Sequence, residues 1–169
     1  YHGLLRSFAA RKLFLLAASW AFYASWSPRF LLLLIATTWI DFQLARVIYR
    51  ARTVSPARAR ALLVASLCLN LGLLAFFKYG LFLYDSAGAL FRLPPAPGFL
   101  AVVVPLGISF YTFHSISYVI DTYRGIRPPT DSFPDFALYV AFFPQLVAGP
   151  ITRWGFFGPQ LAEQPRVGM

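Results

Sequence analysis

The chain has 169 residues, of which 59% are hydrophobic and only 12% are charged, and its mean hydropathy is +0.63. About a quarter of the residues in soluble domains are charged, so this composition excludes an ordinary soluble domain and predicts a polytopic membrane protein. The formal net charge is +9. The cations flank apolar segments, as they do in the cytoplasmic loops of membrane proteins, so nucleic acid is not expected as a partner.

The first half of the chain contains three apolar segments, at about 13–26, 30–48 and 61–84. Pro28 favours a turn between the first two, because it disfavours helix in the residue before it. A group of basic residues surrounds the connection between the second and third segments and predicts that this connection lies in the cytoplasm. The group consists of Arg46, Arg50, Arg52, Arg58 and Arg60.

Asp41 is the acidic residue placed deepest in an apolar segment. A carboxylate in that position faces a polar partner or water. Arg46 follows too far along the chain to be an ideal helical partner, and it could instead point to lipid headgroups. The default expectation is therefore a structural pairing of Asp41.

The second half of the chain contains two further apolar segments. A proline-rich linker at 92–98 precedes a fourth segment at 99–120, which is long enough to cross a bilayer core. Pro105 and Gly107 are expected to break its start, and Gly125 to end the helix. A fifth segment starts near Phe136 and is expected to bend or stop at Pro144. The sequence therefore predicts an all-α polytopic transmembrane protein with about five membrane elements.

The fourth segment is unusual because it carries many hydrogen-bonding side chains. Such groups are costly in hydrocarbon unless they face protein or water, so this segment is expected to line an interior. The residues are Ser109, Tyr111, Thr112, His114, Ser115, Ser117 and Tyr118.

Three motifs, supported by two weaker ones at Phe22–Phe30 and Phe77–Tyr79, resemble the membrane-bound O-acyltransferase family. The resemblance is to the bacterial branch that includes the membrane subunit of alginate O-acetyltransferase and the D-alanyl transferase of teichoic acid. It implies that residues 1–169 form a single partial membrane domain of a larger helical fold, without the downstream catalytic half. The three motifs are PLGISFYTF at Pro105–Phe113, SYVIDTYRG at Ser117–Gly125 and FPQLVAGPI at Phe143–Ile151.

The resemblance also implies an activity. The complete protein would transfer an acyl group, expected to be acetyl, to hydroxyls of a cell-surface polysaccharide such as alginate. Acetyl-CoA or another acyl carrier would be the co-substrate, with no bound cofactor. The expected partners are the lipid bilayer, the polysaccharide acceptor and periplasmic acetyltransfer proteins, and the expected location is the bacterial inner membrane, crossed several times. A channel or transporter, or a membrane anchor subunit, is the alternative.

The resemblance places the catalytic base beyond residue 169, so this chain alone is expected to be inactive. His114 is the only histidine in an expected span, but the family commonly has Gln or another polar residue there, which favours a polar lining role over general-base catalysis. The residues expected to line the reaction chamber are Ser109, Tyr111, His114, Ser117, Tyr118, Gln145, Pro150 and Arg153.

Two interpretations are left open. Asp121 and Arg124 could form an ion pair at a helix end or contact substrate, and the ion pair is favoured. The stretch at 149–153 could form a chamber wall or simply end a helix. Cys68 is the only cysteine, and no Cys/His group has metal-ligand spacing, so no metal is expected.

Overall fold

The computed structural model describes residues 8–91, 94, 103–150 and 152–162. Every regular element within these ranges is a helix, so the prediction of an all-α fold is confirmed for this part of the chain. The linker predicted at 92–98 falls almost entirely outside the described residues. The elements are α1 (Phe8–Trp26), α2 (Pro28–Val54), α3 (Pro56–Phe91), α4 (Ile108–Arg124), α5 (Phe133–Ala141), α6 (Phe143–Ala148) and α7 (Trp154–Ala162).

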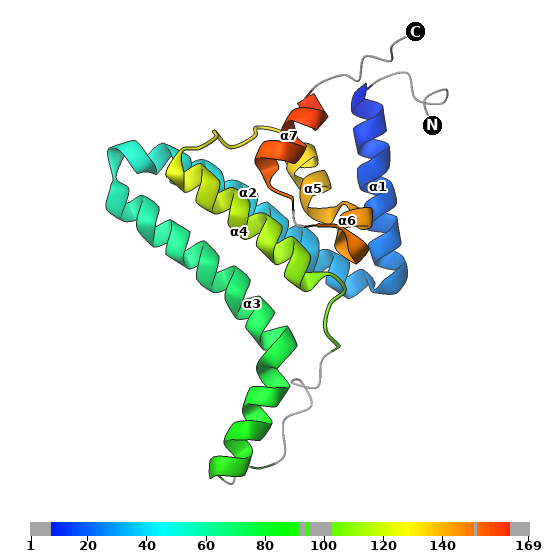
Figure 1. The fold of residues 1–169 in the computed structure, drawn as a ribbon, viewed down its shortest axis with the longest axis vertical. Coiled ribbons are helices and arrows are strands. Elements are labelled where there is room, and N and C mark those ends of the chain that lie inside the picture. Colours follow the sequence, from blue (N-terminus) through cyan, green and yellow to red (C-terminus); the bar gives the residue numbers. More distant parts are fainter. Residues whose placement is uncertain (1–7, 92–93, 95–102, 151, 163–169) are drawn as a thin grey trace.

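The first three helices are joined by single residues, Ser27 and Ser55 (Figure 1). Ser27 has an extended backbone, with φ −160° and ψ 111°, and Pro28 begins α2. Proline suits the first position of a helix because that position needs no backbone N–H donor. Pro56 begins α3 in the same way, and Ser55 N donates to Ala51 O at 2.7 Å. The turn predicted at Pro28 is therefore confirmed.

A glycine flanks α4 at each end. Gly107 has φ 68° and Gly125 has φ 71°, a left-handed conformation that glycine adopts without steric cost. Gly125 N donates to Thr122 O and Ile126 N donates to Asp121 O, both at 3.0 Å, which satisfies the last carbonyls of the helix. The Arg52 guanidinium occupies the space that a Cβ on Gly125 would take. Both predicted ends of this helix are confirmed.

The chain bends between α5 and α6. Ser132 caps α5, since its Oγ accepts a hydrogen bond from Asp135 N at 3.3 Å. The helix ends at Ala141, Phe142 takes φ −59° and ψ 105°, and α6 restarts with Pro144 in its first turn. The bend predicted at Pro144 is confirmed. The helix predicted from Phe136 begins slightly earlier, because the Ser132 cap starts it.

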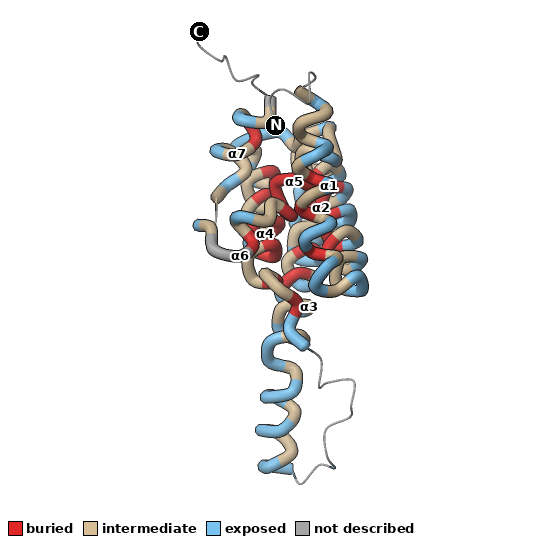
Figure 2. Tube along the Cα trace, turned by 90° about the vertical axis from the view of Figure 1, so that its right-hand side faces the viewer, coloured by how far each residue is buried: buried red, intermediate tan, exposed pale blue. Residues whose placement is uncertain are grey.

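The core lies where α2, α4 and α5 meet, and aromatic rings fill it. Tyr118 packs on Phe136 with ring centroids 4.4 Å apart, and Trp154 of α7 meets Tyr139 at 5.3 Å. Figure 2 shows the buried residues gathered in this body, while the second half of α3 extends away from it.

Two described helices, α2 with 27 residues and α3 with 36, are long and apolar enough to cross a membrane. At about 1.5 Å per residue each exceeds the hydrocarbon thickness of roughly 30 Å. Only 11% of the apolar 18-residue stretch of α3 is buried within the molecule, so most of this stretch is available to lipid or to other protein. Five membrane elements were predicted, and two candidates pass this test.

Candidate functional site

The polar helix predicted from the sequence, α4, lies inside the molecule. It contacts α2, α3, α5, α6 and α7. Its buried residues include Tyr111, Thr112, His114, Ser115 and Tyr118, so most of the hydrogen-bonding side chains face protein. This placement avoids the cost of exposing polar groups to hydrocarbon.

His114 is fully buried at the centre of this face. Its ring lies 5.0 Å from the Tyr139 ring, centroid to centroid. Neither ring nitrogen, Nδ1 nor Nε2, has a hydrogen-bond partner in the described part of the chain. Buried polar atoms in proteins nearly always have partners, so this imidazole keeps hydrogen-bonding capacity that the described helices do not use.

Tyr139 of α5 joins several elements through its hydroxyl. Tyr139 Oη donates to Thr152 O at 2.9 Å, and it lies 3.4 Å from Ser117 Oγ and 3.5 Å from His114 O. Each hydroxyl has one hydrogen, so the short bond to Thr152 is the principal one, and Ser117 Oγ donates to His114 O at 2.9 Å. The hydroxyl therefore ties α5 to the segment before α7, beside α4.

Gln145 of α6 completes this group, because Thr152 Oγ1 donates to Gln145 Oε1 at 3.3 Å. We call the five residues the tyrosine cluster: His114, Ser117, Tyr139, Gln145 and Thr152. It connects α4, α5, α6 and the backbone at Thr152, at the point where the chain bends between short helices.

Three of the residues predicted to line a chamber, namely His114, Ser117 and Gln145, come together in the tyrosine cluster. Tyr118 is also buried, but its hydroxyl accepts a hydrogen bond from Thr130 N at 2.9 Å and so holds the loop after α4. Tyr111 is buried beside Tyr23 of α1.

The other predicted lining residues are Ser109, Pro150 and Arg153, of which Arg153 directly follows Thr152 and interacts electrostatically with Tyr139. Ser109 is partly buried on α4, and Pro150 and Arg153 are exposed. The Arg153 carbonyl accepts the first backbone hydrogen bonds of α7, from Phe156 N and Phe157 N. Roles for these three residues in a chamber stay predictions.

Sequence reasoning missed Tyr139 and Thr152. Every residue of α5 from Phe136 to Ala141 is buried, so Tyr139 sits in an apolar run without a neighbouring polar group to mark it. A single hydroxyl in a fully buried run requires a partner, and that requirement was the available signal.

A second buried polar group surrounds Asp41 on α2, which is fully buried. Asn70 Nδ2 lies 2.9 Å and 3.0 Å from the two carboxylate oxygens, and Ser66 Oγ donates to Oδ1 at 2.9 Å. Ser115 of α4 adds a further side-chain interaction with the carboxylate. We call Asp41, Ser66 and Asn70 the aspartate cluster. The expected structural pairing of Asp41 is confirmed, with partners on α3.

Arg46 pairs elsewhere, with its Nη2 3.5 Å from Asp131 Oδ1 in the loop after α4. Asp121 and Arg124 form no ion pair within the described structure, so the favoured interpretation of these two residues was wrong. The helix end at Gly125 is held by backbone hydrogen bonds instead.

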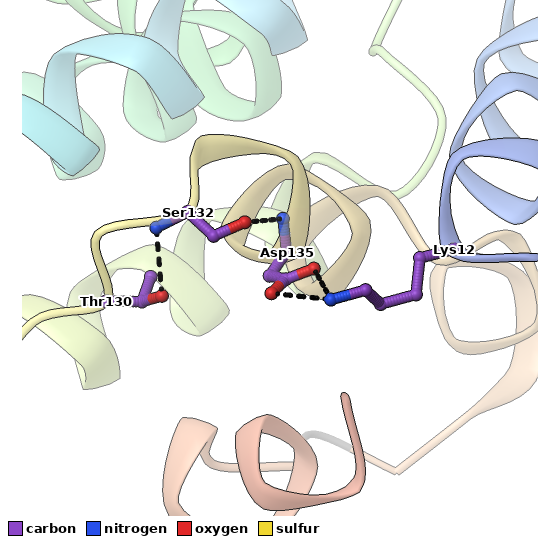
Figure 3. Close-up of polar contacts among 4 residues, drawn as sticks. All are labelled: Lys12, Thr130, Ser132 and Asp135. Atoms are coloured by element: carbon purple, nitrogen blue, oxygen red, sulfur yellow. Dashed lines mark hydrogen bonds and ion pairs between the residues drawn. The ribbon is translucent and has the colours of Figure 1, made fainter. Parts of the chain in front are cut away.

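An ion pair between α1 and α5 borders a surface cavity of about 470 Å³, which Arg127, Thr130, Asp135 and Trp154 help to line. Lys12 Nζ lies 2.7 Å and 2.9 Å from the two Asp135 carboxylate oxygens, next to the Ser132 cap (Figure 3). This contact fixes the start of α5 against α1. Groups of three or more His, Cys, Asp or Glu residues that could hold a metal ion do not occur within the described ranges.

The described part of the chain is thus a helical protein with two candidate membrane spans and a buried polar cluster between bent short helices. Its relatives are bacterial O-acetyltransferases. The chain is 41% identical over 150 residues to the probable alginate O-acetylase AlgI of Pseudomonas aeruginosa, covering 85% of this chain and 28% of that protein. It is also 41% identical over 150 residues to the probable alginate O-acetylase AlgI of Azotobacter vinelandii, covering 85% of this chain and 29% of that protein.

A peptidoglycan O-acetyltransferase of Helicobacter pylori is 33% identical over 177 aligned positions, covering 90% of this chain and 33% of that protein. The chain thus spans about three tenths of the length of the curated relatives it matches. No family model matches the chain, and no solved structure matches it. The resemblance to O-acetyltransferases of the membrane-bound O-acyltransferase type is confirmed over most of this chain.

Proposed function

We propose that this chain is part of a membrane O-acetyltransferase that transfers acetyl groups to hydroxyls of a cell-surface polysaccharide such as alginate. The observation that carries the proposal is the 41% identity over 85% of the chain to proteins named alginate O-acetylases. The relative from Helicobacter pylori, a peptidoglycan O-acetyltransferase, supports a polysaccharide acceptor more generally. These relatives do not favour the channel, transporter or anchor alternatives.

In this proposal the tyrosine cluster forms part of the wall of the reaction chamber. The ring nitrogens of His114, which have no partner among the described residues, support this role, because they can hydrogen-bond a ligand or a further protein segment. The general base that deprotonates the acceptor hydroxyl lies outside these residues. The cluster would help to hold donor and acceptor together in a water-poor interior, where correct placement lowers the entropic part of the barrier.

We further propose a multi-pass arrangement in the bacterial inner membrane. The membrane elements are α1, α2, α3, α4 and the bent pair α5–α6. The arginines around the α2–α3 turn support a cytoplasmic position for this turn. Acetyl-CoA or another acyl carrier then approaches from the cytoplasm, while the acceptor and any periplasmic acetyltransfer partner act on the outer side.

Cysteine labelling tests this topology. In a Cys68→Ser background, an impermeant maleimide added to intact cells should label Arg29→Cys, near the α1–α2 turn, and not Thr53→Cys, near the α2–α3 turn. Both positions are exposed. Labelling of Thr53→Cys alone would reverse the proposed orientation.

A chimera tests the activity. The aligned segment of the Pseudomonas aeruginosa alginate O-acetylase is replaced by this chain, and the chimera is expressed in cells that lack the native protein. The acetyl content of secreted alginate should rise well above that of the deletion strain. A chimera present in the membrane at the native level that leaves alginate unacetylated would contradict the proposal.

A further inference from the structure

Five arginines lie on α2 and α3 around the turn between them, and they differ in how many contacts they make. Arg46 pairs with Asp131 and lies over the Phe42 ring. Arg52 lies over the Tyr49 ring at 4.8 Å and fills the space beside Gly125. Arg50 and Arg58 are exposed, and within the described structure neither has an ion-pair partner.

These two free arginines line the same pocket, which has a volume of about 310 Å³. Its other walls come from Val47, Ala51, Val54 and Ser55. Val54 is 85% exposed and Val47 is 39% exposed, so the apolar wall opens outward. The pocket therefore combines two cations that have no ion-pair partner among the described residues with an apolar surface that faces the surroundings.

The length of α2 relates the pocket to the proposed membrane position. The rise along α2 from Arg29 to Arg50 is about 32 Å at about 1.5 Å per residue, close to the thickness of a bilayer core. If α2 crosses the bilayer, Arg29 lies at one interface and the pocket at the other. The pocket is formed at the α2–α3 turn. Figure 1 shows this turn at its upper left.

The charges around the pocket favour an anion. The first turn of α3 contains Arg58 and no acidic residue, so the chain does not neutralise the positive end of that helix there. A neighbouring cavity of about 190 Å³ also includes Arg50, but Asp131 lines it and would repel a phosphate. The pocket with Arg50 and Arg58 has no carboxylate in its lining.

We propose that this pocket binds the headgroup of an anionic phospholipid. The phosphate lies between the guanidinium groups of Arg50 and Arg58, whose forked donors suit phosphate oxygens. The glycerol and the first acyl carbons lie against Val47 and Val54. The outward apolar wall favours a lipid over a free phosphate, because a soluble anion would leave that wall in contact with water. This inference rests on the proposed membrane position of α2 and uses no residue of the tyrosine cluster.

Native mass spectrometry of the 169-residue chain in neutral detergent tests the site. The probes are phosphatidylglycerol and phosphatidylcholine with identical acyl chains. We expect tighter binding of phosphatidylglycerol, and a loss of about 25-fold in its affinity for Arg50→Gln/Arg58→Gln, since each interfacial cation contributes about a factor of five. The matched control is Arg29→Gln, an exposed arginine at the other end of α2, whose affinity should stay within about twofold.

Two further arms separate a lipid site from a general anion site. Val54→Asp, which places a carboxylate in the apolar wall, should also weaken phosphatidylglycerol binding. Excess inorganic phosphate should leave the bound lipid in place, and displacement by phosphate would show a free-anion site and overturn the proposal. Equal binding of the two lipids would also overturn the proposal. An equal loss of phosphatidylglycerol affinity in Arg29→Gln would do the same. Circular dichroism checks that each variant stays helical. If the double variant does not fold, the two single variants replace it, and each is expected to lose about fivefold in its affinity for phosphatidylglycerol.

Discussion

The two buried polar clusters of this chain differ in how completely they are satisfied. In the aspartate cluster, both carboxylate oxygens of Asp41 accept hydrogen bonds from α3. In the tyrosine cluster, both ring nitrogens of His114 are without a partner in the described residues. A satisfied cluster fixes the helices that supply it, while an unsatisfied one retains capacity to bind. We therefore infer that the first serves the fold and the second serves the proposed reaction.

Removing the carboxylate of the aspartate cluster should have the largest effect on stability. Asp41→Ala leaves two buried donors, Ser66 Oγ and Asn70 Nδ2, without their main acceptor. We expect a loss of about 3 kcal/mol in the free energy of unfolding, since each unsatisfied buried group costs about 1–3 kcal/mol and Asn70 keeps its bond to Ser66 O. Unfolding in mild detergent, followed by circular dichroism, measures it.

The matched control for this prediction is Asp85→Ala, which removes an exposed carboxylate from the same α3 helix that carries Ser66 and Asn70. It should change the free energy of unfolding by less than about 0.5 kcal/mol. Equal effects of the two substitutions would show that the aspartate cluster does not hold α2 to α3.

Removing the hydroxyl of the tyrosine cluster should have a smaller effect. Tyr139→Phe keeps the buried ring and deletes the hydrogen bond to Thr152 O, so we expect a loss of about 1 kcal/mol in the free energy of unfolding. Tyr79→Phe, on the exposed surface of α3, is the control and should be neutral. A loss as large as that of Asp41→Ala would mean that both clusters are structural to the same degree.

Replacing His114 by another polar residue should have little effect on transfer. In the chimera, His114→Gln keeps a hydrogen-bonding side chain but removes any general base near neutral pH. Acetylation of alginate should stay within about threefold of the parent chimera, whereas loss of a general base typically costs about 10²–10⁴-fold. A loss of about a thousandfold at normal membrane level would identify His114 as the base.

The 169-residue chain alone should show no transfer at all. The chain should insert into membranes. Because its tyrosine cluster lacks further partners, the chain should leave a polysaccharide acceptor unmodified when supplied with radiolabelled acetyl-CoA. Label incorporated above a no-protein control would place the chemistry within these residues.

Local signals in the sequence predicted much of this fold. Gly107 and Gly125 marked the ends of α4, and Pro144 marked the bend after α5, because each acts on the backbone of its own neighbourhood. The polar face of α4 was predicted to be interior for the same reason: its residues share one helix.

Pairings between helices were harder to predict. Asp41 needed a polar partner, but its sequence neighbourhood did not identify Ser66 and Asn70. Identifying them required the register of α2 against α3. Asp41 and Asn70 do lie at nearly equal distances along the chain from Ser55, where the two helices meet. The bond from Tyr139 to Thr152 depends on how α5 meets a segment beyond α6, which no local pattern encodes. The expected pair of Asp121 and Arg124 is not present in the described structure, where backbone hydrogen bonds hold that helix end.

The most direct test of the division between the clusters compares His114→Leu with Asn70→Leu in the chimera. The measurement is the acetyl content of alginate divided by the amount of chimera in the membrane. We predict that His114→Leu lowers this ratio by about tenfold at a normal membrane level, while Asn70→Leu lowers the membrane level and leaves the ratio unchanged. The opposite pattern, with His114→Leu affecting only the amount of protein and Asn70→Leu affecting only the ratio, would contradict the account.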